Sequence, residues 1–251
     1  MIFGSKLYRA KLVRNSLAWA REYLDEAPDG SIFLADKLEQ AQGRQGRIWQ
    51  IDQGQLLITA LLKPRTITKI NPDDIAIRIN QLSMALSLGI LEPLKQWGVA
   101  IKWPNDFVIQ DKKVGGMLMQ LVWEGGIVKG IILGFGINVN NVFAPEHELY
   151  QIATSLSMHA AASVVMKELY YELLKTLDHF YELWLDEKFD EIYKQWRQQQ
   201  YYLQRAVSVH QKDGSEIQGV LTQVLPNGDA MIKTELGKIM IVQFHNVDVV
   251  K

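Results

Sequence analysis

The segment 99–140 limits the fold more than any other part of this sequence. Four stretches rich in β-forming residues follow one another in it: VAIKW, DFVIQ, VGGMLMQLVW and IVKGIILGFGINV. Only Pro-Asn, Asp-Lys-Lys and Gly-Gly separate them, and these residues are typical of tight turns. Turns this short join antiparallel neighbours, so the sequence predicts an antiparallel meander.

Helices and further strands are predicted around this meander. Asn15 or Ser16 caps a helix through LAWAREYLDE, and NPDD at 71–74 begins a longer helix that we expect to reach about Trp97. SIFLADKL and QLLITALL have the composition of strands. Together these elements predict an α+β domain over residues 1–200. A helical stretch at roughly 160–200 carries a stripe expected to face the core: Leu169, Leu173, Leu177, Phe180, Leu183 and Trp184.

Residues 201–251 have a different pattern. Short strands there alternate with turns at Asp213-Gly214, Asn227-Gly228 and Glu235-Leu236-Gly237. Such a succession is typical of a small barrel. We therefore predict a second, small β domain after the α+β domain.

Composition and missing motifs exclude several kinds of site. The 251-residue chain has no cysteine, which rules out disulfides and thiolate chemistry, and its net charge of −1 gives no overall field that favours nucleic acid or an anionic membrane. The five histidines are scattered, so a histidine-held metal is not expected, whereas carboxylate-held Mg²⁺ stays open. Without a Walker A motif, a G-x-S-x-G elbow or a complete dinucleotide fingerprint, we expect no redox cofactor. With no apolar run of ~18 residues and no secretory signal, we expect a cytoplasmic protein without a transmembrane helix.

Three polar, glycine-containing segments remain. In AQGRQGRIWQ, at 41–50, Gly43 and Gly46 allow backbone N–H groups to approach an anion. Arg44 and Arg47 offer planar donors to phosphate or carboxylate, and Trp49 is placed to anchor the end of the loop. Taken alone, the segment is more simply explained as a solvated turn.

Of the other two segments, one lies inside a predicted strand and the other spans the ends of a predicted hairpin. In GFGINVN, at 134–140, two glycines interrupt an apolar strand, which indicates close approach of a ligand or another backbone, or else a bulge. The segment KWPNDFVIQDKKVGGMLMQ, at 102–120, is either a polar surface hairpin or part of a binding site. As a site, that hairpin would hold phosphate and Mg²⁺ side by side through Lys102, Asn105, Asp106 and Lys113.

In this order and spacing the three segments resemble the biotin protein ligase family. Its members carry G-R-G-R-R-G-R-x-W, K-W-P-N-D, K-x-x-G-[IM]-L and G-x-G-I-N-V-N, which read here AQGRQGRIW, KWPND, KVGGML and GFGINVN. ATSL at 153–156 is a further similar element, so the likeness spans nearly the whole chain. The resemblance implies a mixed or antiparallel sheet packed with helices, as in class II synthetases, and an SH3-like C-terminal barrel.

Some positions depart from that pattern. Gln42 stands where an arginine is usual, Leu38 where a glutamine is frequent, and Gln120 where a glutamate is frequent. The family's Ser-Thr-Asn reads Asn-Ser-Leu here, so Ser16 keeps a hydroxyl while Leu17 cannot replace an amide. These changes put the substrate preference or the rate in question more than the fold.

The resemblance also implies an activity in two steps. Biotin and ATP, with Mg²⁺, give biotinoyl-5′-AMP and pyrophosphate, and a lysine of an acceptor biotin carboxyl carrier protein then displaces AMP. A lipoate or octanoate ligase or transferase, and a weakened biotin-binding relative, are the alternatives. A DNA-binding repressor is not expected, because the first strand should begin within ten residues of Met1. Pairing of two chains through an exposed sheet edge stays open.

Roles for individual residues follow from the same resemblance. Lys113 would bridge the biotin carboxyl oxygen and the α-phosphate, Arg44 would cover the phosphates together with Arg47, and Asp106 would arrange Mg²⁺. The loop 40–48 is expected to become ordered when a ligand binds. The predicted binding residues are Ser16, Gln42, Gly43, Arg44, Arg47, Trp49, Lys102, Asn105, Lys113, Gly115, Gly116, Gly134, Gly136 and Asn138.

Overall fold

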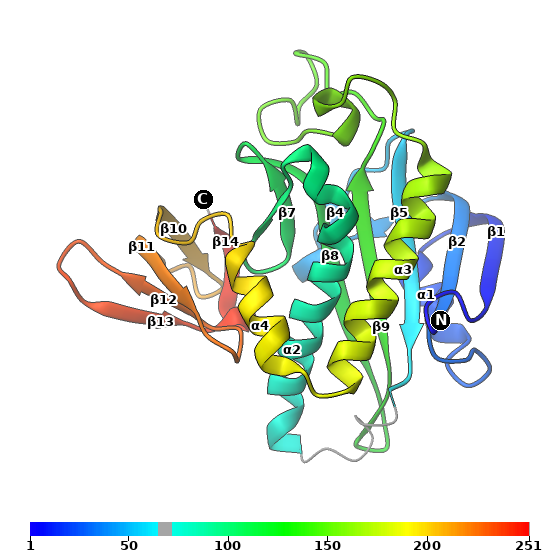
Figure 1. Ribbon diagram of the computed structural model, residues 1–251, viewed down its shortest axis with the longest axis horizontal. Helices are drawn as coiled ribbons and strands as arrows, with labels where there is room; N and C mark the ends of the chain where they lie inside the picture. Colours follow the sequence, from blue (N-terminus) through cyan, green and yellow to red (C-terminus); the bar gives the residue numbers. More distant parts are fainter. Residues whose placement is uncertain (65–71, 251) are drawn as a thin grey trace.

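The computed structural model describes residues 1–64 and 72–250 of the chain. Its centre is a seven-stranded sheet with the order β1-β2-β5-β9-β8-β7-β6 (Figure 1). Among these strands β1 and β2 run parallel and the other neighbours antiparallel, so the predicted mixed sheet is confirmed. The strands are β1 (Leu7–Val13), β2 (Ser31–Leu38), β5 (Gln55–Leu62), β6 (Ala100–Lys102), β7 (Asp106–Ile109), β8 (Lys112–Glu124) and β9 (Ile127–Asn138).

The predicted meander corresponds to β6, β7, β8 and β9, which pair in sequence order. The turn between β7 and β8 lies at Gln110 and Asp111, which adopt left-handed φ values of 49° and 67°. It therefore comes earlier than the Asp-Lys-Lys turn that the sequence suggested. Lys112 and Lys113 already belong to the strand, so their side chains point to opposite faces of the sheet.

Helix α1 (Ser16–Glu22) starts as predicted, with Asn15 as its cap. The Oδ1 atom of Asn15 accepts hydrogen bonds from the N–H groups of Leu17 and Ala18 at 2.9 and 3.0 Å. These bonds satisfy two of the N–H groups that a helix start leaves without partners. Ser16 becomes the first helical residue, and its hydroxyl is left for another contact.

Helix α2 (Pro72–Leu91) is shorter than predicted. Its first residue is the expected proline, whereas Asn71, the predicted cap, lies outside the described residues. The α-helix stops at Leu91 because Pro93 has no N–H to donate, and a 3₁₀ turn over Glu92–Trp97 follows. The carbonyl of Gly89, which an N–H at position 93 would have reached, accepts the Thr176 hydroxyl at 2.6 Å instead.

The helical stretch expected over 160–200 consists of two helices, α3 (Met166–Leu185) and α4 (Phe189–Gln198). Glu187 between them has a φ of 60°, which ends the first helix. The stripe faces the core as predicted, since every member is buried except the half-buried Leu183.

The sheet separates two apolar layers. Ile58, Ala60 and Leu62 of β5 pack into the larger core with α2 and α3, whereas Leu61 packs on the opposite face with α1. This follows the alternation of side chains along a strand. Figure 1 views the face that α2 and α3 cover, and the site forms on the other face, the one that carries α1.

One segment meets the length and composition criterion for a membrane span. It is Asp74–Trp97, found among the residues that the structure describes. Its most apolar window is 61% buried inside the fold, where α2 packs against α3 and α4. Burial in the core accounts for its apolar composition.

The residues after α4 form a five-stranded antiparallel sheet of the order β13-β12-β11-β10-β14, as predicted for an SH3-like unit. The Trp103 Nε1–H donates to the carbonyl of Gly228 at 2.9 Å and joins the two sheets. The division of the chain at residue 200 stays a prediction. The strands are β10 (Ala206–Gln211), β11 (Glu216–Val224), β12 (Ala230–Lys233), β13 (Ile239–Val242) and β14 (Val247–Val250).

Gly89 provides a test of the packing of α2 on α3. A Cβ at this position would lie 2.8 Å from Leu177 Cα, a backbone atom that cannot rotate away. Alanine favours a helix interior over glycine by ~1 kcal/mol, but overpacking costs about 1–3 kcal/mol. We expect Gly89→Ala to lower the free energy of unfolding measured in urea. A midpoint that stays the same or rises would contradict the close approach of these helices.

Candidate active site

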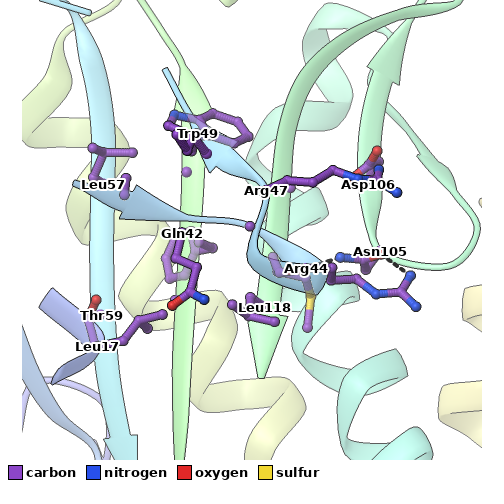
Figure 2. A pocket seen from close by; sticks show the side chains of 18 of the residues that line it. Leu17, Gln42, Arg44, Arg47, Trp49, Leu57, Thr59, Asn105, Asp106 and Leu118 are labelled. Carbon is purple, nitrogen blue, oxygen red and sulfur yellow. Dashed lines mark hydrogen bonds between the residues drawn. The ribbon is translucent and has the colours of Figure 1, made fainter. Parts of the chain in front are cut away.

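A cavity of about 220 Å³ opens on the face of the sheet that carries α1. The middle parts of β5, β8 and β9 form its floor, α1 begins at one end, and the β6–β7 turn lies at the other. A short hairpin lies over it, made of β3 (Ala41–Gln42), the 3₁₀ turn Arg44–Gly46 and β4 (Ile48–Trp49) (Figure 2). We call residues 40–49 the lid.

Two glycines of β9 let α1 and the lid approach the sheet. A Cβ at Gly134 would lie 2.7 Å from Leu17 Cδ2, and one at Gly136 would lie 3.1 Å from the Trp49 ring. Close approach rather than a bulge accounts for these glycines, since β9 keeps an unbroken register there, but side chains approach instead of the predicted ligand or backbone. The groups that approach are a leucine of α1 and the tryptophan that ends the lid.

An ion pair between Lys113 and Asp106 marks one end of the cavity. The Nζ and Oδ1 atoms are 2.7 Å apart, and Lys113 Nζ also lies 5.4 Å from the centre of the Trp49 ring. Gly116 lies beneath the pair, because a Cβ there would be 3.0 Å from Asp106 Oδ1. Both side chains are partly exposed, so the pair adds at most ~1 kcal/mol to stability. The main effect of the pair is to hold the Lys113 ammonium group at the cavity.

Lys102 is a second cation at this end. It stands opposite Asp106 in the β6–β7 register and also lines the cavity. Burial lowers the pKa of the Lys102 amine, Asp106 raises it, and the charge of Lys113 lowers it again. Two lysines and a single carboxylate therefore line this end of the cavity, which favours an anionic ligand.

The backbone of Lys113 is held by the segment that contains ATSL. The Lys113 N–H donates to the Ile152 carbonyl at 2.8 Å, and the Thr154 N–H donates to the Lys113 carbonyl at 2.9 Å. Lys112, the preceding residue, directs its ammonium group to the Tyr150 carbonyl at 2.7 Å. The two adjacent lysines thus have different surroundings, and Lys113 is the one that lines the cavity.

The lid is tied to both sheets. Arg44 donates to Asn105 Oδ1 at 2.9 Å and to the Phe244 carbonyl at 3.2 Å, and its guanidinium lies 5.1 Å from the Phe244 ring centre. Gln45, which has a φ of 58°, donates to the Val247 carbonyl at 2.9 Å. Arg44 therefore holds the lid in addition to bringing charge, a function that its sequence position did not indicate.

The opposite end of the cavity is mostly apolar. Leu17, Leu57 and Leu118 line it, and the Thr59 hydroxyl donates to Ser16 Oγ at 2.8 Å. Figure 2 shows Leu17, Thr59 and Gln42 at this end, well apart from Asp106. The cavity thus has a cationic end and an apolar end, as an acid with an apolar body requires.

Most of the predicted site residues line this cavity, but two do not. A Cβ at Gly115 would lie 2.9 Å from the Gly136 carbonyl oxygen, so Gly115 allows β8 and β9 to pack instead of facing a ligand. Asn138 is buried beside the cavity and donates to the Thr154 carbonyl at 3.0 Å. The predicted residues that do line the cavity are Ser16, Gln42, Gly43, Arg44, Arg47, Trp49, Lys102, Asn105, Asp106, Lys113, Gly116, Gly134 and Gly136.

Other residues of the wall were not predicted. Leu57 and Thr59 alternate along QLLITALL on the face opposite the larger core, and that alternation could have identified them. Val250 has no comparable signal, because its place at the cavity depends on the contact between the lid and the C-terminal sheet.

The described residues offer little for a metal held by the protein alone. No group of three or more His, Cys, Asp or Glu side chains in these parts of the chain could hold an ion. Asp106 is the one carboxylate among the described residues that line the cavity.

The geometry agrees with what comparison with known proteins finds. A family model described as the biotin/lipoate A/B protein ligase family matches residues 12–138, about half of the chain. The chain belongs to this family. The matched region contains the lid, the Lys102–Asp106 hairpin, Lys113, Gly134 and Gly136.

Several proteins of known activity are similar to this chain. The bifunctional ligase/repressor BirA of Bacillus subtilis is 30% identical over 170 residues, 65% of this chain and 50% of BirA. A biotin–[acetyl-CoA-carboxylase] ligase of Paracoccus denitrificans is 31% identical over 126 residues, 47% of this chain and 49% of that protein. The chain thus spans about half the length of these two relatives. The solved biotin protein ligase from Aquifex aeolicus in complex with biotin and ATP has a TM-score of 0.80 and 26% identity, over 98% of this chain and 99% of that one.

Removal of the Arg44 side chain tests whether it holds the lid. The Gly43 N–H donates to the Arg47 carbonyl at 2.7 Å, and the Arg47 N–H to the Arg44 carbonyl at 3.1 Å. We expect Arg44→Ala to speed hydrogen exchange of these two amides by about tenfold, because the bonds to Asn105 and Phe244 are lost.

Arg9→Ala is the matched control, since Arg9 pairs with Asp36 on the exposed edge of the main sheet at 2.8 Å. Equal exchange at Gly43 in the two variants, measured by mass spectrometry of lid peptides, would show that Arg44 does not hold the lid.

Proposed function

We propose that the chain is an ATP-dependent ligase that activates biotin as biotinoyl-5′-AMP and transfers it to a lysine of an acceptor protein. The observation that carries this proposal is the Lys113–Asp106 pair at the cationic end of an apolar cavity beneath the lid. An acid lying along the cavity would bring its carboxylate to Lys113. The complex of the Aquifex aeolicus relative with biotin and ATP supports this pair of substrates.

In the first step the biotin carboxylate attacks the α-phosphate of ATP, a mixed anhydride forms, and pyrophosphate leaves. Two anions must meet, so positioning and charge neutralisation are the main requirements. Lys113 holds the carboxylate oxygen against the α-phosphate, and Lys102 adds a second positive charge nearby. Arg47 faces the phosphates from the lid, while Arg44 keeps the lid closed over the anhydride and limits access of water.

Mg²⁺ enters this proposal together with ATP. In nucleotide sites Mg²⁺ is commonly held by one or two carboxylates and by phosphate oxygens. A single lining carboxylate, Asp106, fits a metal shared with the nucleotide, and the metal would neutralise phosphate charge. Asn105 is less suited to the metal, because its Oδ1 already accepts a hydrogen bond from Arg44.

In the second step an acceptor lysine attacks the carbonyl carbon of the anhydride. An amide forms, AMP leaves with the bonding electrons, and the amine proton passes to solvent. Lys113 then stabilises the leaving phosphate. We take the acceptor to be a biotin carboxyl carrier protein and the location to be the cytoplasm. The name of the Paracoccus denitrificans relative, a biotin–[acetyl-CoA-carboxylase] ligase, supports a carboxylase as the acceptor.

A lipoate or octanoate ligase is the second candidate function. Leu17 favours it, because this side chain lies against Gly134 and makes the far end of the cavity more apolar. Such acids have no cyclic urea, so they need fewer polar partners there.

Pyrophosphate exchange into ATP distinguishes these functions. We expect exchange driven by biotin to exceed exchange driven by lipoate or octanoate. Lys113→Ala should lower it by about 10²–10³-fold, as for the loss of one preorganised donor.

Lys112→Ala is the control for that variant, because this neighbour binds the Tyr150 carbonyl outside the cavity. We expect it to keep near-normal exchange. Exchange that no acid drives, or equal losses in both lysine variants, would contradict the proposed roles.

Transfer is tested separately with a biotin carboxyl carrier domain. We expect intact mass spectrometry to show one biotinoyl group per domain after incubation with ATP and biotin. The product should be lost when the target lysine of the domain is replaced by arginine. Exchange activity without this product would leave the first step intact and exclude a carrier domain as the acceptor.

A further inference from the structure

We propose that Gln42 of the lid selects the polar ring of biotin. The inference rests on the proposed function and deepens it, because it assigns a specificity-determining residue in the same cavity. The Gln42 side chain points from β3 toward the end of the cavity where Leu17 and Thr59 lie, and away from Asp106 (Figure 2).

The chemistry of the substrate sets what that end must provide. Biotin has a carboxylate at one end and a cyclic urea at the other, with one carbonyl acceptor and two N–H donors. When the carboxylate lies at Lys113, the urea reaches the end near α1. A urea removed from water requires both donors and acceptors from the protein, since unpaired polar groups are costly to bury.

The wall near α1 provides few such groups. Leu17 is buried there and lies against Gly134. The hydroxyl hydrogen of Thr59 is used in its bond to Ser16, so this pair leaves one donor, the Ser16 hydroxyl hydrogen. The acceptor oxygen of Asn15 is used twice, by the N–H groups at the start of α1. A primary amide carries two donors and an acceptor on one group, and Gln42 brings such an amide to this end.

The other amides of the wall are less suited. Asn105 accepts from Arg44 at 2.9 Å and donates to the Met117 carbonyl, so both of its functions are used at the cationic end. Gln40 is the real competitor, because it lies two residues before Gln42 and also lines the cavity. The experiment must therefore separate these two glutamines.

Selection by Gln42 would link ring recognition to lid closure. Gln42 pairs with Ile48 across the lid hairpin, whose turn Arg44 and Gln45 bind to the C-terminal sheet. An acid without the urea gains nothing from this amide. The lid would then distinguish biotin from a fatty acid, while α1 would not.

The test compares biotin with octanoate in the full chain. Kd for biotin comes from calorimetry, and KM and kcat for both acids come from pyrophosphate exchange. We expect Gln42→Leu to raise Kd and KM for biotin by about 5- to 30-fold, as for one or two neutral hydrogen bonds, without an equal loss in kcat. The preference for biotin over octanoate should fall by the same factor. Leu17→Asn in the Gln42→Leu background should recover part of the biotin affinity.

Gln45→Leu is the matched control, because this lid glutamine binds the Val247 carbonyl and does not line the cavity. It should weaken both acids together. Gln40→Leu should leave the preference for biotin in place. A biotin-specific loss in Gln40→Leu, or an equal loss for both acids in Gln42→Leu, would overturn the assignment to Gln42.

These outcomes remain distinct from failure of the proposed function. If the unmodified chain binds biotin but catalyses no exchange, the ligase function fails, and the calorimetric series still decides the role of Gln42. If the unmodified chain binds no biotin, both proposals are wrong.

Discussion

The antiparallel pairing of β8 with β9 is the constraint on which the rest of the structure depends. It places Gly116 opposite Gly136 and Leu118 opposite Gly134. On one face the pairing holds Phe135 in the larger core, and on the other face the glycines leave space above the strands. Because the side chains of a strand alternate, one hairpin supplies both the apolar support and the floor of the cavity. A shift of one residue in register would exchange these two faces.

The lid connects the main sheet with the C-terminal sheet through hydrogen bonds. Its strands belong to neither sheet, and its hydrogen bonds reach Asn105 of the main domain and the carbonyls of Phe244 and Val247. Moving the lid away from the cavity would therefore break hydrogen bonds to the C-terminal sheet as well as to Asn105. The C-terminal sheet thus supplies two backbone acceptors that hold the lid in place.

Features that depend on neighbours in sequence were predictable, and those that depend on distant neighbours were not. The strands, the turn glycines and the Asn15 cap follow from local sequence patterns. The spacing of the motifs predicted Lys113 as a site residue, and it lines the cavity. Gly115 and Gly116 look equivalent in the sequence, but only the register with β9 shows that Gly115 packs against the Gly136 carbonyl while Gly116 faces the ion pair. Likewise the hydrogen bond from Gln45 to the Val247 carbonyl joins residues about two hundred positions apart, and no pattern in the neighbouring sequence predicts it.

The electrostatics of the cationic end explain why a partly exposed ion pair can matter for chemistry. Lys102 is partly buried, and its amine is harder to protonate than an ordinary lysine because burial disfavours its charged form. Asp106 offsets this cost only in part, since it also pairs with Lys113. A carboxylate or phosphate placed in the cavity would add negative charge beside both lysines. In the proposed reaction, the same two cations would oppose the repulsion between a carboxylate and a phosphate brought together in the cavity.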